Sequence, residues 1–390
     1  MKIALFGGSF NPVHIGHISS AEAALESLKP DLLLMIPAGT PPHKELAENS
    51  PEASERFRLI KLATEDIDKI EVSDIEISRE GRSYTADTVR GILELYPGAE
   101  LYLILGSDML LIFESWYEYE WLLKVCTIVV FARHNDDEEN RELALAVKEL
   151  GRKYDAIVRY IEKPIIDVSS TELRESLPKR GGRGFIPKRV YAELVRFGYY
   201  GTKPDLDWLR ECGHEMLEPK RIAHVTECEK TARKLAEHWG EDADKASEAA
   251  ILHDCTKKLS HEEQLKLCRK YGIIVDELTL NMPKLMHAVT GAEIARVEFG
   301  LPPEVVNAIR WHTTGRAGMS ALEQILYLAD YIEPTRDFDG LERLRELAYS
   351  SLNDAMVLAL NMSIDELKGQ GMSAHPDTRS ALDSLESAGE

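Results

Sequence analysis

The chain has 390 residues, of which 47 are Lys or Arg and 67 are Asp or Glu, and its formal net charge at pH 7 is −20. Both halves are acidic, which argues against a protein that coats nucleic acid or an anionic membrane by bulk electrostatic attraction. A phosphate-bearing ligand must therefore be bound by individual basic side chains, backbone N–H groups or metal ions. The length predicts two or three domains.

The apolar segments and the cysteines predict a cytoplasmic protein. The longest apolar stretches, 32–36 and 125–132, are far too short to span a bilayer. Met1 and Lys2 lead directly into a strand-like run, so we expect no signal peptide. The five cysteines are odd in number and form no CxxC pair, which favours a reducing compartment over a disulfide framework.

Short apolar runs alternate with amphipathic segments through the first half of the chain. The predicted strands are Ile3–Phe6, Leu32–Ile36, Leu101–Leu105 and Thr127–Phe131, and the predicted helices are 17–28, 55–65, 85–95 and 139–151. This alternation predicts a Rossmann-like α/β fold with a doubly wound parallel sheet. Ligands of such a sheet lie beyond the carboxyl ends of its strands.

The pattern changes near Gly198–Pro204, after which only helical periodicity remains. The predicted helices are 227–239, 243–253, 261–271, 286–299, 303–312, 319–332, 340–348 and 351–361. We therefore predict an α/β domain at 1–202 and an all-α domain at 203–390. The residues from Gly369 onward are polar and predict a short helix with a frayed end.

The first candidate site follows the first predicted strand, in the segment Gly7–His17. Two glycines let backbone N–H groups approach an anion closely, and a helix that starts near His17 presents its positive N-terminus to a phosphate. His14 and His17 can both reach that phosphate. The segment resembles the HxGH signature of the nucleotidyltransferase superfamily, which implies that both histidines stabilise charge on the α-phosphate during nucleotidyl transfer. The loop residues that the resemblance places at the substrate are Gly7, Gly8, Ser9 and Phe10.

A second phosphate-binding element is predicted at Val168–Arg174. Ser169 and Glu172 have the spacing of a capping box, which requires no function. The segment also resembles the SSTxIR motif of the same superfamily, with Leu173 in place of Ile. The resemblance implies that the phosphates of ATP are held by Ser170, Thr171 and Arg174.

Further segments in consistent order, over about residues 1–200, resemble bacterial nicotinate-nucleotide adenylyltransferases. These segments are 41–44, 55–56, 83–88, 106–108 and Trp116. The resemblance implies that Thr85 and Trp116 hold a nicotinate group and that Lys44 contacts the acceptor phosphate. A buried core Trp and an ordinary polar turn are the alternatives. The remaining predicted substrate-binding residues are Gly106, Asp108 and Arg133, although His134-Asn135 follows Arg133 where the family often has Pro-Gly.

Histidines and aspartates in the second half lie in helix-like sequence environments, well separated along the chain. They are His224, His253, Asp254, His287, His312 and Asp330. Helical bundles build metal sites from such side chains on facing helices, and imidazole with carboxylate suits iron, manganese or zinc better than calcium. The alternative is a set of separate core or surface histidines, to which we assign His214, His238, His261 and His375.

The order H…HD…H…H…D resembles the HD superfamily of metal-dependent phosphohydrolases. The strings at His224 and at 330–336 resemble the bacterial HD hydrolases that cut diadenosine tetraphosphate into two ADP, over about residues 205–380. The resemblance implies two divalent ions, with Asp254 bridging them. Lys257 and Arg336 are candidates for neutralising the polyphosphate, with surface charges as the alternative. The HD signature also fits guanosine tetraphosphate hydrolases, deoxynucleotidases and cyclic-dinucleotide phosphodiesterases.

The sequence thus predicts a bifunctional enzyme. Its first domain is expected to transfer AMP from Mg²⁺-bound ATP to nicotinate mononucleotide in NAD biosynthesis, and its second to hydrolyse diadenosine tetraphosphate with two metals, iron being favoured over manganese or zinc. The alternatives are transfer to pantetheine phosphate, and an HD domain that cleaves another nucleotide or serves as a regulatory sensor. We expect small-molecule nucleotides as partners, with no nucleic acid and no membrane; the sequence leaves a homo-oligomer and coupling between the sites open.

Overall fold

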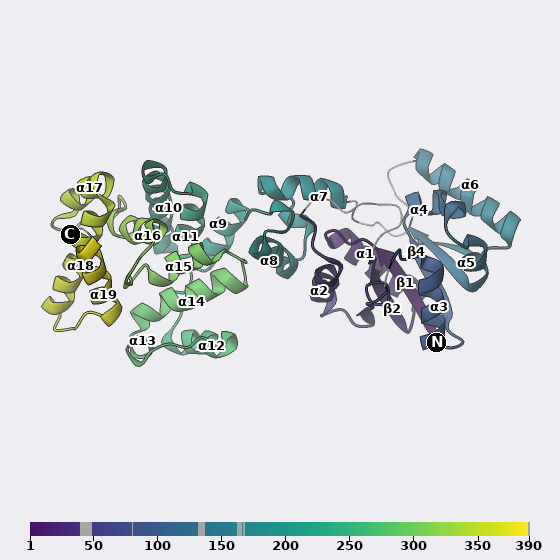
Figure 1. Cartoon of the computed structure of the whole chain (residues 1–390), viewed down its shortest axis with the longest axis horizontal. Coiled ribbons are helices and arrows are strands. Elements are labelled where there is room, and N and C mark those ends of the chain that lie inside the picture. Colours follow the sequence, from purple (N-terminus) through teal and green to yellow (C-terminus); the bar gives the residue numbers. More distant parts are fainter. Residues whose placement is uncertain (40–48, 80, 132–136, 162–165, 167, 389–390) are drawn as a thin grey trace. The chain divides into compact units, whose positions relative to one another are not determined.

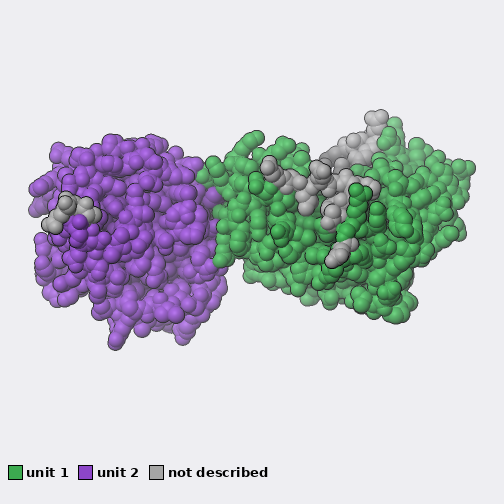
Figure 2. All heavy atoms as spheres, viewed as in Figure 1, with its two compact units in different colours: residues 1–203 green, residues 204–390 purple. Residues whose placement is uncertain are grey.

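The computed structural model describes residues 1–39, 49–79, 81–131, 137–161, 166 and 168–388. The chain divides into two compact units, residues 1–203 and 204–390, which Figure 2 shows in different colours. The predicted fold class, an α/β unit followed by a helical unit, is confirmed. Within the described residues, no helix combines the length and the apolar character that crossing a membrane requires.

The first unit is built on a parallel sheet that has six strands in the described part of the chain (Figure 1). The strands are β1 (Lys2–Gly8), β2 (Leu32–Pro37), β3 (Ile70–Val72), β4 (Glu100–Leu105), β5 (Cys126–Phe131) and β6 (Val158–Ile161). Their order is β3-β2-β1-β4-β5-β6, so the sheet extends from β1 to both sides. The carboxyl ends of β1 and β4 therefore meet at a topological switch point, where such sheets bind ligands.

Helices cover both faces of this sheet. They are α1 (Ile15–Leu28), α2 (Ala53–Thr64), α3 (Thr85–Leu95), α4 (Ser107–Leu111), α5 (Tyr119–Val125), α6 (Asp137–Tyr154), α7 (Ser170–Ser176) and α8 (Lys188–Phe197), with 3₁₀ turns at Phe113–Ser115, Leu177–Lys179, Arg183–Phe185 and Tyr199–Gly201. Alternate strand residues such as Leu5 and Leu103 pack in one apolar core with Val89 of α3 and Leu122 of α5. Figure 1 shows α1 and α2 on the opposite side of the sheet from α3 and α5.

The two edge strands, β3 and β6, were not predicted. Both are short, and most of their side chains are partly or fully exposed, so neither has the buried apolar run that marks β2. An edge strand has a neighbour on one side only and can remain polar. Hydrophobic periodicity therefore identifies the central strands and misses the edges.

The second unit is helical throughout its described residues (Figure 1). Its helices are α9 (Leu206–Glu215), α10 (Pro219–Trp239), α11 (Ala243–Leu252), α12 (His261–Tyr271), α13 (Glu277–Asn281), α14 (Pro283–Val297), α15 (Pro303–Trp311), α16 (Ala321–Ile332), α17 (Leu341–Ser350), α18 (Leu352–Gly369) and α19 (Pro376–Ala388). Helix α16 is the central one: it contacts α10, α11, α15 and α18, and its capping box of Ser320 and Glu323 fixes where it begins.

Helices α9 and α13 were not predicted, and α18 extends to Gly369 instead of ending at 361. Two further helices differ from the prediction. Helix α10 begins at Pro219 rather than at 227, because Pro219 provides a helix start at N1 that the mixed polar sequence hides. The polar carboxy-terminal segment forms α19 instead of a short, frayed helix, because Ala381 and Leu385 are buried. The correction to α10 matters for function, since it places His224 inside a helix.

Candidate functional site

The switch point of the first unit holds a cavity of about 590 Å³. Residues at the ends of β1, β2 and β4 line it, among them Gly7, Gly8 and Leu105. A second cavity of about 230 Å³ shares these three residues and also His17 and Gly106, so the two adjoin along the ends of β1 and β4. This position is where a doubly wound sheet places its ligand.

His14 and His17 come together at the first turn of α1. His14 is the N-cap of this helix, and the two imidazole rings stack with their centroids 3.7 Å apart. Both residues line the smaller cavity, and His17 also lines the larger one. A Cβ on Gly16 would lie 2.7 Å from the carbonyl oxygen of Ile166, so only glycine fits between the two histidines.

Both histidines are neutral at pH 7. Burial lowers the pKa of His14 to about 4, and burial together with the charge of His14 lowers the pKa of His17 well below its ordinary value. The backbone N–H of His14 donates to Nδ1 of His17 at 3.3 Å, so the proton of the neutral His17 ring is on Nε2. His17 can therefore donate a hydrogen bond from Nε2 to an anionic ligand.

The loop between the glycines and His14 is held by side chains that bind its carbonyl oxygens. Arg56 donates to Ser9 O at 2.6 Å, Arg174 donates to Asn11 O at 2.6 Å, and Ser170 Oγ lies 3.3 Å from Pro12 O. Because the N–H of a trans peptide points opposite to its C=O, binding the Ser9 carbonyl also fixes the direction of the next amide. Side chains from distant parts of the sequence thus orient the phosphate loop.

The predicted substrate residues of this unit fall into three groups. Those that line the larger cavity are Gly7, Gly8, Ser9, Thr85, Gly106, Asp108 and Trp116. Those that line neither cavity are Phe10, whose buried ring packs on His17, and Ser170, Thr171 and Arg174, which lie on α7. Lys44 and Arg133 lie outside the described residues.

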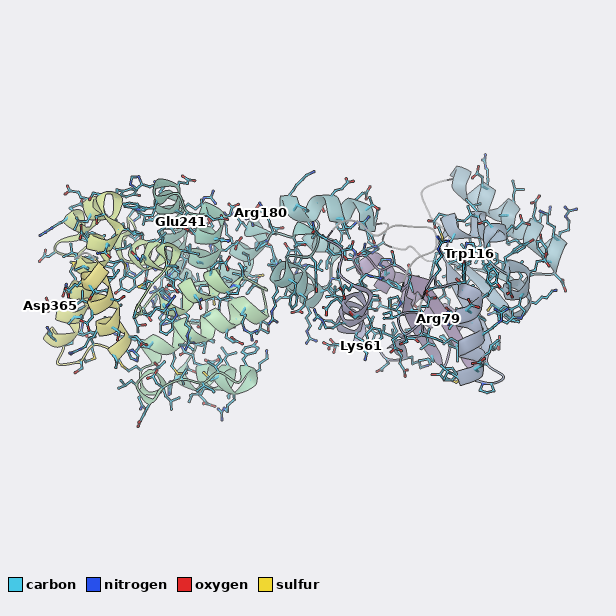
Figure 3. All side chains as sticks on the ribbon, viewed as in Figure 1. Lys61, Arg79, Trp116, Arg180, Glu241 and Asp365 are labelled. Atoms are coloured by element: carbon cyan, nitrogen blue, oxygen red, sulfur yellow. The ribbon has the colours of Figure 1, made fainter. Side chains whose placement is uncertain are left out.

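Trp116, labelled in Figure 3, lines the larger cavity together with Tyr84 and Tyr117. Its ring packs on Phe113 with the centroids 5.0 Å apart, and its buried indole Nε1 has no hydrogen-bond partner within the described structure. A buried donor without a partner is costly, and a ligand acceptor would remove that cost. The unpartnered Nε1 and the position in the cavity wall are compatible with a ligand contact at Trp116.

The six predicted metal ligands of the second unit converge on one buried cluster. His224 comes from α10, His287 from α14 and Asp330 from α16, while His253 and His312 are the residues at which α11 and α15 end. Asp254 follows His253. The carboxylate Oδ1 of Asp330 lies 3.1 Å from His224 Nε2, and Oδ1 of Asp254 lies 3.1 Å from His287 Nε2.

Two subsets of this cluster have the geometry of a metal site. One is His224, His253 and Asp330, and the other is His253, Asp254 and His312; in each, the potential ligand atoms lie within 4.8 Å of one another. The two oxygens of Asp254 face different imidazoles, with Oδ1 toward His287 and His312 and Oδ2 toward His253 and His224. This arrangement suits a carboxylate that bridges two ions.

Hydrogen bonds fix the tautomers of two of these histidines. Nδ1 of His253 lies 2.7 Å from Ala250 O and Nδ1 of His312 lies 2.6 Å from Ile309 O. A carbonyl oxygen can only accept, so both Nδ1 atoms carry the proton and both Nε2 atoms present lone pairs. His224 has a carboxylate at each ring nitrogen, Glu333 at Nδ1 and Asp330 at Nε2.

One unpaired nitrogen supports the fit of a metal to this cluster. Within the described structure, Nε2 of His253 is buried and has no hydrogen-bond partner, and the carboxylates of Asp254 and Asp330 lie near it. An unpartnered imidazole lone pair beside carboxylates is what a divalent metal requires. The cluster therefore offers ligands for a divalent metal.

Basic side chains surround the carboxylates of the cluster. Lys257 Nζ lies 3.0 Å from Asp254 Oδ1, Arg221 also donates to Asp254, and Arg336 donates to Asp330 Oδ1 at 2.5 Å. Although burial opposes its ionisation, the neighbouring His253 and His287 hold the pKa of Asp254 well below its ordinary value. Both aspartates are therefore ionised and available as ligands.

Comparisons with known proteins agree with this division. Residues 5–176 match the cytidylyltransferase-like family and residues 221–335 match the HD domain. The probable nicotinate-nucleotide adenylyltransferase of Clostridium tetani is 34% identical over 200 residues, which are 51% of this chain and 98% of that protein. The chain belongs to the nicotinate-nucleotide adenylyltransferase family. This match confirms the resemblance noted in the first 200 residues.

Relatives that include the second unit are also found. A Mycoplasma genitalium protein named probable nicotinate-nucleotide adenylyltransferase/Ap4A hydrolase is 28% identical over 371 residues, covering 92% of this chain and 97% of that protein. A solved structure from Clostridium acetobutylicum, titled a predicted HD superfamily hydrolase involved in NAD metabolism, is 36% identical, with a TM-score of 0.45, and covers 47% of this chain and 97% of that one. The match of residues 221–335 to the HD family model shows that the second unit carries an HD domain, as predicted.

Several residues at the two sites were not predicted. In the adenylyltransferase unit they are Arg56, Tyr117 and Glu76, whose buried carboxylate lines the larger cavity and accepts from Thr88 Oγ1 at 2.8 Å. In the HD unit they are Arg221 and Glu333. Arg56 and Glu333 lie in segments whose resemblance to known families was noted, 55–56 and 330–336, but neither residue was given a role; nothing local marks Glu76.

The segment 168–174 keeps half of its predicted capping box. Ser169 is the N-cap of α7 and its Oγ accepts from the backbone N–H of Thr171 at 3.2 Å. The cap thus uses the second amide of the helix rather than the third, which is the amide a capping box uses. It positions Arg174 to bind the phosphate loop and also Thr171 Oγ1, at 3.0 Å.

Proposed function

We propose that the first unit transfers AMP from ATP to nicotinate mononucleotide, giving nicotinate adenine dinucleotide and pyrophosphate. This proposal rests on the stacked, neutral pair of His14 and His17 at the switch point of the sheet. The larger cavity beside them has Trp116 and Thr85 in its wall. The names of relatives that are 34% identical or more over this unit support the same substrates.

The reaction requires positioning and charge stabilisation. An oxygen of the mononucleotide phosphate attacks the α-phosphorus of ATP, and the bond from that phosphorus to the pyrophosphate oxygen breaks. The N–H at Nε2 of His17 donates to an α-phosphate oxygen as charge develops, which is worth most in a buried site. Mg²⁺ bound to the ATP phosphates would neutralise part of the charge on the departing pyrophosphate. We propose Lys44, Arg133, Ser170 and Thr171 as further phosphate contacts.

Arg174 can serve both the loop and the substrate. A guanidinium has five N–H donors, and the bonds to Asn11 O and Thr171 Oγ1 use two of them. The remaining donors of Arg174 are proposed to contact ATP phosphates, so that the same side chain holds the loop and the phosphates in one geometry.

An acceptor panel tests this proposal. Purified full-length protein is incubated with ATP, Mg²⁺ and either nicotinate mononucleotide, nicotinamide mononucleotide or pantetheine phosphate, and the dinucleotide products and pyrophosphate are quantified. We expect nicotinate adenine dinucleotide to dominate, and His17→Asn to lower kcat by about 10²–10³. Preferential use of pantetheine phosphate would refute the acceptor, and a full rate in His17→Asn would refute the role of the histidine.

We propose that the HD unit hydrolyses diadenosine tetraphosphate symmetrically into two ADP at a two-metal centre. This proposal rests on the buried cluster of six candidate ligands. Two groups of three residues within it have the spacing of a metal site, and both groups include His253. Two bound ions would lower the pKa of a water and clamp the attacked phosphate. The residues proposed to hold them are His224, His253, Asp254, His287, His312 and Asp330, and iron is the proposed metal, with manganese and zinc as alternatives.

The basic residues around the cluster provide the remaining chemistry. Lys257 and Arg336, now paired with Asp254 and Asp330, are placed to neutralise a polyphosphate bound at the same carboxylates. The proposal includes a cytoplasmic location, which the free state of all five cysteines supports. It names nucleotides as the partners and allows a homo-oligomer.

Product analysis and metal analysis test the second activity together. Full-length protein loaded with iron, manganese or zinc is given diadenosine tetraphosphate, and the products are separated by chromatography. We expect ADP alone; ATP with AMP would indicate asymmetric cleavage. His253→Ala and Asp254→Ala should lose bound metal and hydrolysis, while His214→Ala, a histidine outside the cluster, should keep both. A cluster variant with unchanged hydrolysis would refute the metal site, and nucleotide binding without hydrolysis by the metal-loaded protein would favour a sensor.

A further inference from the structure

A cavity of about 510 Å³ adjoins the metal cluster of the HD unit. It is lined by Asp330 and Tyr331 at the end of α16, by Arg336 and Phe338 in the connection to α17, and by Met362 and Glu366 of α18. Its volume falls in the range of small-molecule binding sites, and Asp330 belongs to both the cavity and the metal cluster. A ligand in this cavity can therefore contact Asp330, a member of the metal cluster.

The cavity has apolar walls made of flat or flexible side chains. Tyr331 stacks on Tyr327 in a nearly parallel arrangement and meets Phe338 edge to face, with ring centroids 5.4 Å apart. Tyr331, Phe338 and Met362 are all only partly buried, so each retains surface for a ligand. Met362 is four residues before Glu366, which puts both on one face of α18. Gly340 brings the connecting segment close, since a Cβ there would lie 3.2 Å from Met362 Cε.

The charged side chains that line this cavity indicate which part of a substrate it can bind. The cavity lining has one cation, Arg336, which is already bound to Asp330 through its NH2 group and to the Asp330 carbonyl through Nε. It has two carboxylates, Asp330 and Glu366. Arg336 and Asp330 neutralise each other at the side of the metal cluster, so Glu366 leaves the other side of the lining negative and unfavourable for phosphate. A neutral heterocycle can stack there on the aromatic rings and donate its N–H groups to the Glu366 carboxylate.

We propose that this cavity, the base pocket, binds the nucleobase and ribose of a nucleotide whose phosphates lie at the metal cluster. The proposal rests on the HD unit acting on nucleotides. The aromatic rings and Met362 contact the base, Glu366 accepts hydrogen bonds from N–H or ribose O–H groups, and Arg336 stands between base and phosphates. Residues 331–366 thereby determine that the substrate is a nucleotide, which the metal ligands alone do not.

Steady-state hydrolysis by the full-length, metal-loaded protein provides the first test. Phe338→Ala should raise the KM for diadenosine tetraphosphate, and the inhibition constant of ADP, by roughly tenfold or more, as loss of base stacking does elsewhere. The inhibition constant of pyrophosphate, which has no base, should change less than twofold. Met362→Ala should act in the same direction, and Met372→Ala, an exposed methionine outside the pocket, should have no effect.

Photolabelling provides a readout that does not depend on turnover. The protein is irradiated with 8-azido-ADP and Mn²⁺, with and without excess ADP, and labelled peptides are identified by mass spectrometry. Label that ADP displaces from 331–338 or 352–369 supports the base pocket even if no hydrolysis occurs, in which case the proposed activity alone fails. The proposal of a base pocket would be refuted if Phe338→Ala hydrolysed diadenosine tetraphosphate with unchanged kinetics and the label were found elsewhere in the HD unit. The proposed hydrolytic activity would then still hold.

Discussion

Replacing Arg56 with Met should destabilise the adenylyltransferase unit and loosen its phosphate loop. The Arg56 side chain is fully buried and donates to Ser9 O at 2.6 Å, to Ala38 O at 2.7 Å and to Gly39 O at 3.3 Å. It thereby connects the loop after β1 to the loop after β2. Methionine keeps the unbranched stem but removes every donor, so these carbonyl oxygens lose that partner.

The two short bonds set the size of the effect. A hydrogen bond from a charged donor contributes about 1.5–3 kcal/mol, so the pair contributes roughly 3–6 kcal/mol. Removing a buried guanidinium also regains its desolvation cost, which places the net loss near the lower limit, about 3 kcal/mol. For a unit of this size, that loss corresponds to a fall in melting temperature of about 6–12 °C. A shifted loop should also lower kcat/KM for ATP, by about tenfold or more.

Arg58 provides a matched control on the same helix. It is 40% exposed and pairs with Glu55 and Glu193 at the surface, so Arg58→Met should cost only about 0–1 kcal/mol while making the same change in net charge. Calorimetry of the full-length variants with and without ATP gives the measurement, because ATP raises only transitions of units that bind it. If both variants melt within about 2 °C of each other and share the wild-type kcat/KM, the loop does not depend on Arg56.

Three further outcomes are expected. Trp116→Phe should raise the KM for nicotinate mononucleotide severalfold with little change in melting temperature, since it removes the unpaired Nε1 donor and keeps most of the ring; an unchanged KM in steady-state assays would assign that donor no role. Burial lowers the pKa of His14 to about 4, so between pH 6.5 and 4 the unfolded chain binds a proton at this residue that the folded unit does not. Lowering the pH from 6.5 toward 4 should therefore lower the unfolding free energy of the adenylyltransferase unit by up to about 3 kcal/mol. The decrease should be smaller in His14→Gln. Removal of metal with a chelator should lower the melting temperature of the HD unit and leave the ATP-sensitive transition in place; a single unchanged melting curve would contradict a structural contribution of the cluster.

The sequence alone predicts those site residues whose arrangement depends only on neighbours that are close along the chain. Gly16 and the flanking histidines are fixed by one turn of backbone, and β2 is an unbroken buried run, so short-range pattern contains the information. The six candidate metal ligands were singled out by their order along the chain and their helix-like contexts, which resemble HD proteins, and the structure brings them into one cluster. These predictions required no knowledge of the tertiary structure.

Residues that act through long-range contacts were not predictable in this way. Arg56 is separated by 47 residues from Ser9, and although the segment 55–56 resembles the family, nothing in the sequence indicates that its side chain binds this loop. Glu333 lies 109 residues from the histidine that it orients. Arg221 depends on the start of α10 at Pro219, which periodicity placed later. In each case the partner is chosen by packing between elements, which a linear pattern does not contain.

The two sites use the same side chain in opposite ways, and the partner of Nδ1 decides which. In the adenylyltransferase unit, Nδ1 of His17 accepts a backbone N–H, so its Nε2 must carry the proton and can donate to a phosphate. In the HD unit, Nδ1 of His253 and Nδ1 of His312 donate to carbonyl oxygens one helical turn earlier, so their Nε2 atoms present lone pairs to a metal. The difference follows from position on the helix: His17 lies in the first turn of α1, where the N-cap amide needs an acceptor, whereas His253 and His312 follow the last turns of α11 and α15, where carbonyls need donors. Under the functions proposed above, a chain with a net charge of −20 binds phosphates with an imidazole donor at a helix start and with metals held by imidazoles and carboxylates.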